Sequence, residues 1–318
     1  MPPVPACWQG ACESGVEFKS SHCNKKLFGA CSFIKGVKQG VFNISKPDDY
    51  DSPRDYEGHG TRTSSTAAGR HVPFANYFGY ANGTAIAVAP ASDTLAGMDQ
   101  AIEDGVDLMS LSLGFIEMPF YENPIALGAF AAMGKGIFVS CSAGNGGPHA
   151  YAIHNGAPWI TTVGSGTIDR DFAAHVTLGM YIFCDFNDQV SVFQQLYDMN
   201  STGAAGAIFS SDSRQFLRPD DFNMPFVTVI PKPAPQVAVS SSRGPGRIAP
   251  WILKPDILAP GVDILAAWVP NRKGAPIRDD YLLTDNNIVS GISMASPHVV
   301  GRAALLKATH RDWSPAAI

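Results

Sequence analysis

Helix-like and strand-like segments alternate along the middle of the chain, and this alternation restricts the possible folds more than any other feature. Residues 95–103 and 124–135 have helical character, and the second segment has a proline near its start and glycines near its end. Each is followed by a short apolar run typical of a buried strand, 108–113 and 137–139. Because such repeats form right-handed crossovers, they predict an α/β fold in which helices cover both faces of a parallel sheet.

The composition is typical of a loop-rich globular protein. The chain has 318 residues, of which 45% are hydrophobic and 16% are charged, and it contains 31 glycines and 24 prolines. A chain of this length can bury a large core and has room for one domain with an insert. The net charge is −5 and the basic residues are scattered, which argues against nucleic acid as a partner.

The sequence has no pattern that indicates a membrane span, a signal peptide or a metal site. No apolar run approaches the length of a transmembrane helix, so no membrane partner is expected. Residues 1–5 lack the basic and apolar regions of a signal peptide, so we expect none in this chain. The acidic run 48–51 lacks the spacing of a calcium loop and the cysteines lack metal-type spacing, so no metal is expected.

A serine stands at the start of an apolar segment near the C-terminus. Residues 291–298 read Gly-Ile-Ser-Met-Ala-Ser-Pro-His, and residues 299–306 are apolar on nearly every face, which predicts a core helix. Pro297 suits the first turn of this helix, where a missing N–H costs little. The hydroxyl of Ser293 would lie near unpaired backbone N–H groups, which can stabilise a developing oxyanion. By itself, however, the motif is more typical of a simple N-capping serine.

Two further polar motifs lie upstream. His59 stands between two glycines in residues 57–61, and histidine is the usual general base for a serine hydroxyl because its pKa is near neutrality. Asn145 follows the apolar run 137–141 and lies between glycines, where its side-chain amide could donate to an oxyanion. Taken singly, a histidine is more often structural and an Asn-Gly pair is more often a turn.

Together, and in this chain order, the three motifs resemble those of the plant-type subtilisin-like serine proteases, the subtilases. The resemblance extends over essentially the whole chain. It implies an α/β, subtilisin-like three-layer fold with a mostly parallel sheet, and an extracellular or cell-wall location. Further matching segments are residues 52–55, 101–107, 157–164, 241–245, 253–261 and 312–318.

The resemblance also implies roles for individual residues. Ser293 matches the nucleophile, His59 the general base and Asn145 the side-chain donor to the oxyanion. The implied reaction is cleavage of a peptide bond through an acyl-enzyme, without a cofactor. The partner would be a peptide or protein substrate in an extended conformation, held by strand addition, and the oligomeric state stays open. The residues that would pair with the substrate backbone are Ser112, Leu113 and Gly114 on one side and Ser142, Ala143 and Gly144 on the other.

Departures from the family pattern predict impaired catalysis. The resemblance implies that the strand with the triad aspartate either lies before residue 1 or does not exist. Arg62 replaces a second histidine and needs water or a carboxylate as a partner, and Ile292 replaces a threonine. Only residues 91–94 remain where the family has an inner strand and a loop. The acidic residues before His59 lie in a polar, proline-containing run and are poor substitutes for the aspartate: Asp48, Asp49, Asp51 and Asp55.

The chain divides into three predicted parts. Residues 1–178 and 234–318 resemble the two halves of a catalytic domain, and the second half carries the nucleophile. Residues 179–233 resemble a shortened protease-associated domain insert that is small for a self-sufficient core. These apparent deletions leave an alternative to an impaired endopeptidase, namely a non-catalytic pseudoprotease or fragment that at most binds extended peptides.

Cysteines and glycosylation sequons bear on the compartment of the protein. The resemblance implies a disulfide between Cys12 and Cys23, which indicates an oxidising compartment. Cys141 lies in an apolar run and is expected to pack as a small core residue. Three sequons would be glycosylated if the chain were secreted, and their asparagines are Asn43, Asn82 and Asn200.

Overall fold

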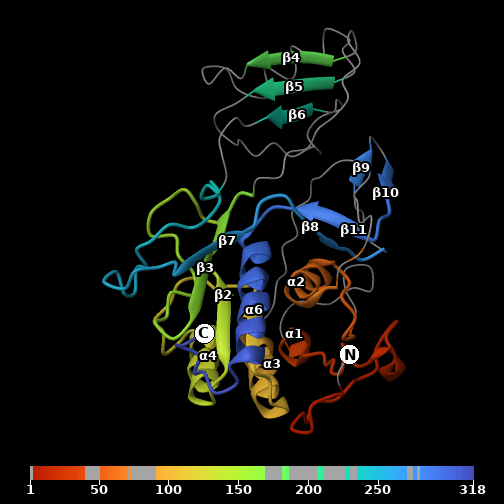
Figure 1. The fold of residues 1–318 in the computed structure, drawn as a ribbon, viewed down its shortest axis with the longest axis vertical. Coiled ribbons are helices and arrows are strands. Elements are labelled where there is room, and N and C mark those ends of the chain that lie inside the picture. Colours follow the sequence, from red (N-terminus) through yellow and green to blue (C-terminus); the bar gives the residue numbers. More distant parts are fainter. Residues whose placement is uncertain are drawn as a thin grey trace.

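Helices pack against a parallel sheet in the body of the molecule (Figure 1). The computed structural model describes residues 3–39, 51–70, 72, 91–168, 181–185, 206–210, 226–229, 235–270, 275–277 and 280–318. The helices are η1 (Ser20–His22), α1 (Lys35–Gln39), α2 (His59–Ala68), α3 (Ala91–Asp104), α4 (Pro124–Gly134) and α6 (Ile292–Thr309). The strands are β1 (Leu108–Leu111), β2 (Phe138–Ser142), β3 (Thr161–Gly166), β4 (Tyr181–Asp185), β5 (Gly206–Ser210), β6 (Phe226–Val229), β7 (Ile257–Pro260), β8 (Ile264–Ala267), β9 (Ala275–Ile277), β10 (Asp280–Leu282) and β11 (Asn286–Val289).

The central sheet has four parallel strands in the order β1-β2-β3-β7. The predicted strands 108–113 and 137–139 form β1 and β2, and the predicted helices 95–103 and 124–135 form most of α3 and α4. The prediction of a parallel α/β sheet is therefore confirmed. Within the described residues β1 pairs only with β2, so it lies at an edge of this sheet.

Local sequence explains why α4 begins and ends where it does. The Asn123 side chain accepts hydrogen bonds from the backbone N–H groups of Ile125 and Ala126, at 3.0 and 3.2 Å, and Pro124 occupies the first turn. After the helix, Gly136 adopts a positive φ of 78°, a conformation that favours glycine. The boundaries predicted from proline and glycine are confirmed.

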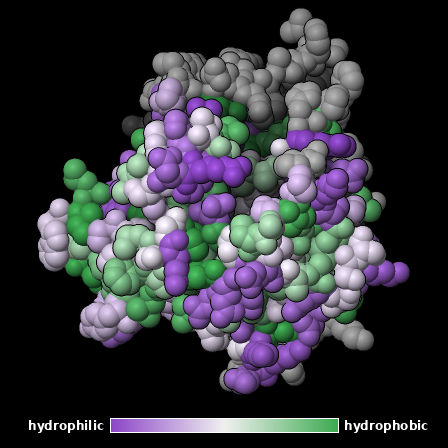
Figure 2. All heavy atoms as spheres, turned by 60° about the horizontal axis from the view of Figure 1, so that its bottom comes forward, coloured by the Kyte–Doolittle hydropathy of each residue, from purple (hydrophilic) through white to green (hydrophobic). Residues whose placement is uncertain are grey.

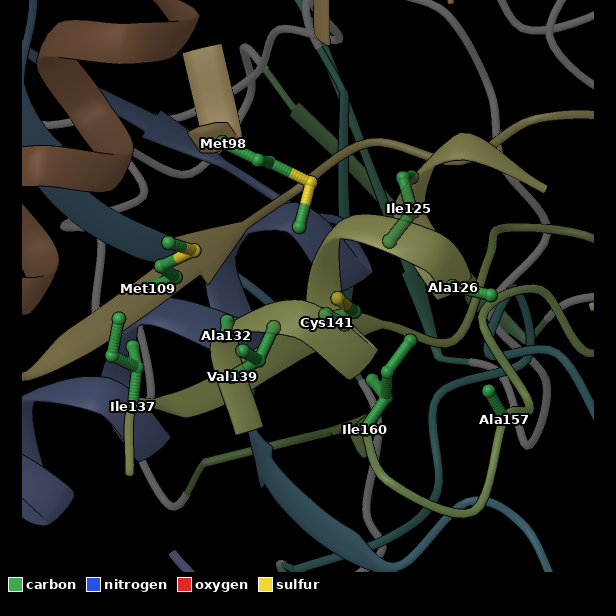
Figure 3. Close-up of a cluster of buried hydrophobic side chains, with 11 residues drawn as sticks. Met98, Met109, Ile125, Ala126, Ala132, Ile137, Val139, Cys141, Ala157 and Ile160 are labelled. Carbon is green, nitrogen blue, oxygen red and sulfur yellow. The ribbon is translucent and has the colours of Figure 1, made fainter. Parts of the chain in front are cut away.

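The two faces of the sheet are covered by different helices, as the alternation along β2 shows. Val139 and Cys141 point into a hydrophobic cluster with α3 and α4 (Figure 3), whereas the Ser140 hydroxyl lies 3.1 Å from the Ser296 hydroxyl of α6. Because successive strand residues point to opposite faces, α4 and α6 lie on opposite sides of the sheet. The buried members of the cluster are Met98, Met109, Ile125, Ala126, Ala129, Ala132, Ile137, Val139, Cys141, Ala157 and Ile160.

The short segment 91–94, where the family pattern has a strand and a loop, forms the first turn of α3. Its Asp93 is buried and accepts hydrogen bonds from the backbone N–H groups of Gly36, at 2.7 Å, and Val37, at 3.1 Å. These charge-assisted bonds satisfy the start of α1. Asp93 therefore fixes α1 against α3.

A separate parallel sheet, β4-β5-β6, lies apart from the body (Figure 1). It falls within residues 179–233, whose identity as a shortened protease-associated insert stays a prediction. Two antiparallel pairs complete the fold, β8 with β11 and β9 with β10. The β8–β11 pair matters for the site because β11 ends directly before α6.

Polar and apolar residues are mixed on the surface that Figure 2 shows. Figure 2 shows hydrophilic and hydrophobic residues interspersed over one face, which is common on surfaces in contact with water. No helix among the described residues is long and apolar enough to cross a membrane.

Candidate active site

Ser293 is the second residue of α6. Gly291 caps the helix in an extended conformation, and its N–H donates to the carbonyl of Gly261 at 2.7 Å. The Ser293 hydroxyl donates to the Ser112 carbonyl at 3.2 Å, and the Ser112 hydroxyl donates to the Ser293 carbonyl at 2.9 Å. This reciprocal pair ties the proposed nucleophile to the first residue of a proposed substrate-binding segment.

Pro297 has a different place from the one predicted. The helix begins at Ile292, so Pro297 lies inside it rather than in its first turn. A residue at this position would normally donate its N–H to the carbonyl four residues earlier, which belongs to Ser293. The Ser112 hydroxyl supplies the missing hydrogen bond to that carbonyl. The hydrogen bond from Ser112 to the Ser293 carbonyl therefore compensates for the N–H that Pro297 lacks.

Asn145 lies just past the carboxyl end of β2, beside the start of α6. Its side-chain oxygen accepts a hydrogen bond from the Ile292 N–H at 3.2 Å. This bond orients the carboxamide and leaves its nitrogen as a donor, because none of the described residues accepts a hydrogen bond from it. An amide donor next to a serine at a helix start is the arrangement that stabilises an oxyanion.

His59 is the first residue of α2, and glycine is required before it. Gly58 has a φ of 95°, and a Cβ there would lie 2.9 Å from the ring of Trp268. The Asp55 carboxylate accepts hydrogen bonds from the N–H groups of Gly58, at 2.9 Å, and Thr61, at 2.5 Å. Asp55 therefore caps α2 and holds the histidine at the mouth of the helix.

The environment of His59 favours the neutral imidazole that a general base needs. Burial lowers its pKa below the usual value, the Asp55 carboxylate opposes this by raising the pKa, and the Arg62 guanidinium lowers it further. No hydrogen bond links His59 to Ser293 in the structure, and the serine hydroxyl is engaged by Ser112 instead. Catalytic hydrogen bonds are often long or poorly aligned without substrate.

Helix packing brings the base and the nucleophile to one region. α2 packs against α6, and Gly301 of α6 lies so close to α2 that a Cβ would be 2.8 Å from the Ala67 carbonyl oxygen. On its other side α2 contacts β8: the Arg62 guanidinium donates to the Ile264 carbonyl, and the Ser65 hydroxyl accepts from the Ala267 N–H at 3.2 Å. Arg62, which the sequence marked as a departure, is fully buried.

The acidic residues before His59, expected to be poor substitutes for the triad aspartate, make no hydrogen bond to the histidine where the structure describes them. Asp51 pairs with Lys38 at 2.6 Å in an exposed position. Both oxygens of Asp55 are occupied by backbone amides. Asp48 and Asp49 lie outside the described residues. No described carboxylate is hydrogen-bonded to His59.

The two proposed substrate-binding segments lie next to each other. Residues 112–114 follow β1, residues 142–144 end β2, and these parallel neighbours place both segments at the same edge of the sheet. Ligands of open α/β sheets bind at this carboxyl edge. Sequence reasoning missed Asn155, whose side chain bridges both segments. Its place within a loop gave no signal.

The predicted residues also include the cysteines and the asparagines of the glycosylation sequons. Cys12 and Cys23 form a disulfide, while Cys7, Cys31 and Cys141 are free. Cys141 is fully buried in the core, and this burial raises its pKa. The sequon residues Asn43, Asn82 and Asn200 lie outside the described residues. Within the described ranges, no group of histidine, cysteine and acidic side chains could hold a metal ion.

Comparisons with known proteins identify the family of the chain. The sequence profile of the Subtilase family matches residues 12–318, so the chain belongs to the subtilase family. Subtilisin-like protease SBT1.7 of Arabidopsis thaliana is 38% identical over 413 residues, covering 99% of this chain and 54% of that protein. Subtilisin-like protease SBT3 of Solanum lycopersicum is 37% identical over 411 residues, covering 100% and 53%. The chain therefore spans about half the length of these relatives.

Two features of these comparisons concern the architecture. Each alignment is longer than the chain itself, so the matching part of each relative contains segments without a counterpart here. Among solved structures, the S41 psychrophilic protease has a TM-score of 0.48 and 19% identity, covering 86% of this chain and 70% of that one. Sphericase has a TM-score of 0.47 and 19% identity, covering 86% and 71%. The family match, together with the observed parallel sheet, assigns the α/β subtilisin fold.

Proposed function

We propose that this chain carries the site of a serine endopeptidase that cleaves peptide bonds through an acyl-enzyme on Ser293. The observation that carries the proposal is the start of α6, where the side chain of Asn145 accepts a hydrogen bond from the N–H of Ile292, the residue before Ser293. His59 is held on the neighbouring helix with a lowered pKa. These three residues supply a nucleophile, an oxyanion donor and a base.

The proposed reaction has two halves. His59 removes the hydroxyl proton as the Ser293 oxygen attacks the peptide carbonyl, and the Asn145 amide donates to the resulting oxyanion. His59 then gives the proton to the leaving amine, and the acyl-enzyme remains. Water next attacks the ester, transferring a proton to His59, which returns it to the Ser293 oxygen. The substrate would lie extended between residues 112–114 and 142–144.

We expect the activity to be low. None of the described carboxylates bonds to the His59 imidazole, so none orients it or directly pairs with its charged form. In subtilisin, removing the triad aspartate alone costs about 3 × 10⁴ in kcat, against about 2 × 10⁶ for the serine or histidine. The site would therefore retain reactivity toward activated probes more readily than toward peptides.

A second candidate function is peptide binding without cleavage. It is favoured by the hydrogen bond from the Ser293 hydroxyl to the Ser112 carbonyl, which occupies the nucleophile. A non-catalytic pseudoprotease would keep the substrate-binding edge and lose the transfer of the serine proton to His59. The two candidate functions differ in whether the Ser293 hydroxyl is reactive.

The experiment that separates them is labelling with a fluorophosphonate probe. Purified protein, shown to be folded by circular dichroism, is compared with Ser293→Ala. Labelling confined to the unmutated protein supports the endopeptidase. Folded protein that does not react would contradict it and leave peptide binding as the function.

The proposal also includes an extracellular location of the protein and a protease-associated insert. The Cys12–Cys23 disulfide supports an oxidising, extracellular or cell-wall location, where the sequons would be glycosylated. The separate sheet β4-β5-β6 supports a shortened protease-associated insert at residues 179–233. Mass spectrometry of protein secreted from plant cells tests the first point, because an unmodified chain would contradict glycosylation.

A further inference from the structure

We infer that Asn155 is a positioning residue that fixes the spacing of the two proposed substrate-binding segments, and we call the proposed path of the peptide along them the channel. The inference rests on the proposed function in one respect, namely that residues 112–114 and 142–144 hold the peptide. It concerns binding geometry rather than chemistry, and it adds a residue outside the serine, histidine and asparagine already assigned.

The side chain of Asn155 joins both segments at once. Its amide nitrogen donates to the Leu113 carbonyl at 2.9 Å and to the Ser142 carbonyl at 2.9 Å. These carbonyls belong to segments 29 residues apart along the chain, on neighbouring strands. A single planar group that holds both carbonyls sets the distance between the two segments.

The adjacent residue, His154, reinforces this link. Its backbone N–H donates to the Ala143 carbonyl at 2.8 Å. Its imidazole fills the space beside two glycines: a Cβ at Gly114 would lie 3.0 Å from the ring, and one at Gly144 would lie 2.7 Å from it. The dipeptide 154–155 therefore contacts both segments.

Asn155 is kept in this place despite two unfavourable features. Its φ of 56° is left-handed, a conformation in which asparagine is one of the few tolerated residues. Its side-chain oxygen is buried and has no hydrogen-bond partner among the described residues, and the residue as a whole is only 7% exposed. A buried polar atom without a partner costs stability and calls for an explanation.

The surroundings of Asn155 indicate why its left-handed backbone and its unpaired oxygen are kept. Asn155 lines a small pocket next to the segments, together with Phe115, Ala126 and Ala157. The Thr162 hydroxyl donates to the Asn155 carbonyl at 2.8 Å and anchors the loop to β3. The amide donors are thereby aimed at the two segments from a loop that is fixed to the sheet. A peptide between the segments would meet a preset spacing and lose less entropy on binding.

The test compares two probes that differ in their need for the channel. A small alkyl fluorophosphonate needs only the reactive serine, whereas a tetra-alanyl phosphonate must also occupy the channel. We expect Asn155→Asp, which replaces the donor by a carboxylate facing two carbonyls, to reduce the ratio of the peptidyl to the small-probe labelling rate by about tenfold or more. Asn155→Gly keeps the left-handed backbone and removes the donors, and should reduce the ratio by a smaller factor. Because both probes react only with folded protein, the ratio is insensitive to partial unfolding.

Asn145→Ala serves as the matched control at the other asparagine. It should slow both probes equally and leave their ratio unchanged, because it acts on the oxyanion rather than on the channel. An unchanged ratio in both Asn155 variants would overturn the inference.

A binding measurement separates this inference from the proposed chemistry. Fluorescence anisotropy of a fluorescein-labelled tetra-alanine peptide is measured on Ser293→Ala, with and without Asn155→Asp, in the absence of any reaction. If the unmutated chain does not label but Asn155→Asp weakens peptide binding about tenfold, the endopeptidase proposal fails and the inference holds. Equal binding by the two variants, or no binding by either, would overturn the inference.

Discussion

The two helices of the site are held in place in different ways. α6, which carries Ser293, lies over all four strands of the central sheet, whereas α2, which carries His59, contacts α6 and β8. The only buried residue of α2 is Arg62. The buried residues of α6 are Ile292, Met294, Ala295, Ser296, Pro297, Val300 and Ala303.

Packing holds the helix of Ser293 in place, whereas charged side chains hold the helix of His59 in place. The proposed nucleophile Ser293 is positioned by close-packed side chains of α6 and a serine pair against β2, so its place depends on volume. The base is positioned by the Asp55 cap and by the Arg62 bond to β8, so its place and its pKa depend on charge. Substitutions that affect α6 should therefore change mainly the stability, whereas changes to the charges around α2 should also change the pKa of His59.

The largest effect is expected where the two helices touch. Gly301→Ala adds a methyl group 2.8 Å from the Ala67 carbonyl oxygen and should destabilise the protein by about 1–3 kcal/mol while separating the base from the nucleophile. Gly134→Ala is the matched control in α4, because a Cβ there meets nothing within 4 Å, and it should stabilise by about 0.5–1 kcal/mol. Urea unfolding and fluorophosphonate labelling measure both quantities. Equal stability and labelling in the two variants would show that this contact does not position the base.

Loss of the α2 cap should have the next largest effect. Asp55→Ala removes both acceptors for the Gly58 and Thr61 amides and should cost about 1–2 kcal/mol in the free energy of unfolding. Asp55→Asn keeps one acceptor oxygen, so it should cost less. Both variants remove the charge that raises the pKa of His59, so this pKa should fall in an NMR titration of the imidazole. A pKa that rises would contradict the electrostatic account of α2.

On the nucleophile side, the corresponding change should alter stability without altering the pKa of His59. Ser140→Ala removes the hydroxyl that lies 3.1 Å from the Ser296 hydroxyl and should cost about 1 kcal/mol. Ser110→Ala is the matched control, because Ser110 pairs with Ser140 across the sheet but is exposed. Thermal unfolding of both variants tests this. A shift in the His59 pKa in Ser140→Ala would remove the distinction between the two helices.

The smallest effect on the pKa of His59 is expected from the charge of Arg62, which acts on it less than Asp55 does. Arg62→Met keeps the unbranched stem of the side chain and removes the guanidinium that lowers the pKa of His59, so this pKa should rise. In the unmutated protein the pKa should lie below about 6.5, because burial disfavours the imidazolium. Labelling of Ser293 should therefore persist to lower pH in the unmutated chain than in Arg62→Met. The opposite order would show that Arg62 does not act on the base.

Local patterns were sufficient to predict α4, most of α3, the strands β1 and β2 and the core part of α6. α4 begins at Pro124 and ends at Gly134 because an asparagine cap, a proline and glycines mark its limits in the sequence itself. The alternation of helices and strands likewise predicted the parallel sheet, since each crossover depends on neighbouring segments. Pro297 was placed wrongly because spacing alone does not reveal where a helix begins.

The fold class, the family and the order of the motifs around His59, Asn145 and Ser293 can be predicted from the sequence. They depend on local propensity and on residue identity. The tertiary structure alone decided that Ser112 replaces the hydrogen bond lost at Pro297, that Asp55 is committed to capping α2, and that Asn155 joins two strands. The bonds of Ser112 and Asn155 link residues 181 and 42 positions apart. Such contacts are created only when the sheet and its helices pack, since no local pattern encodes which distant carbonyl a side chain will meet.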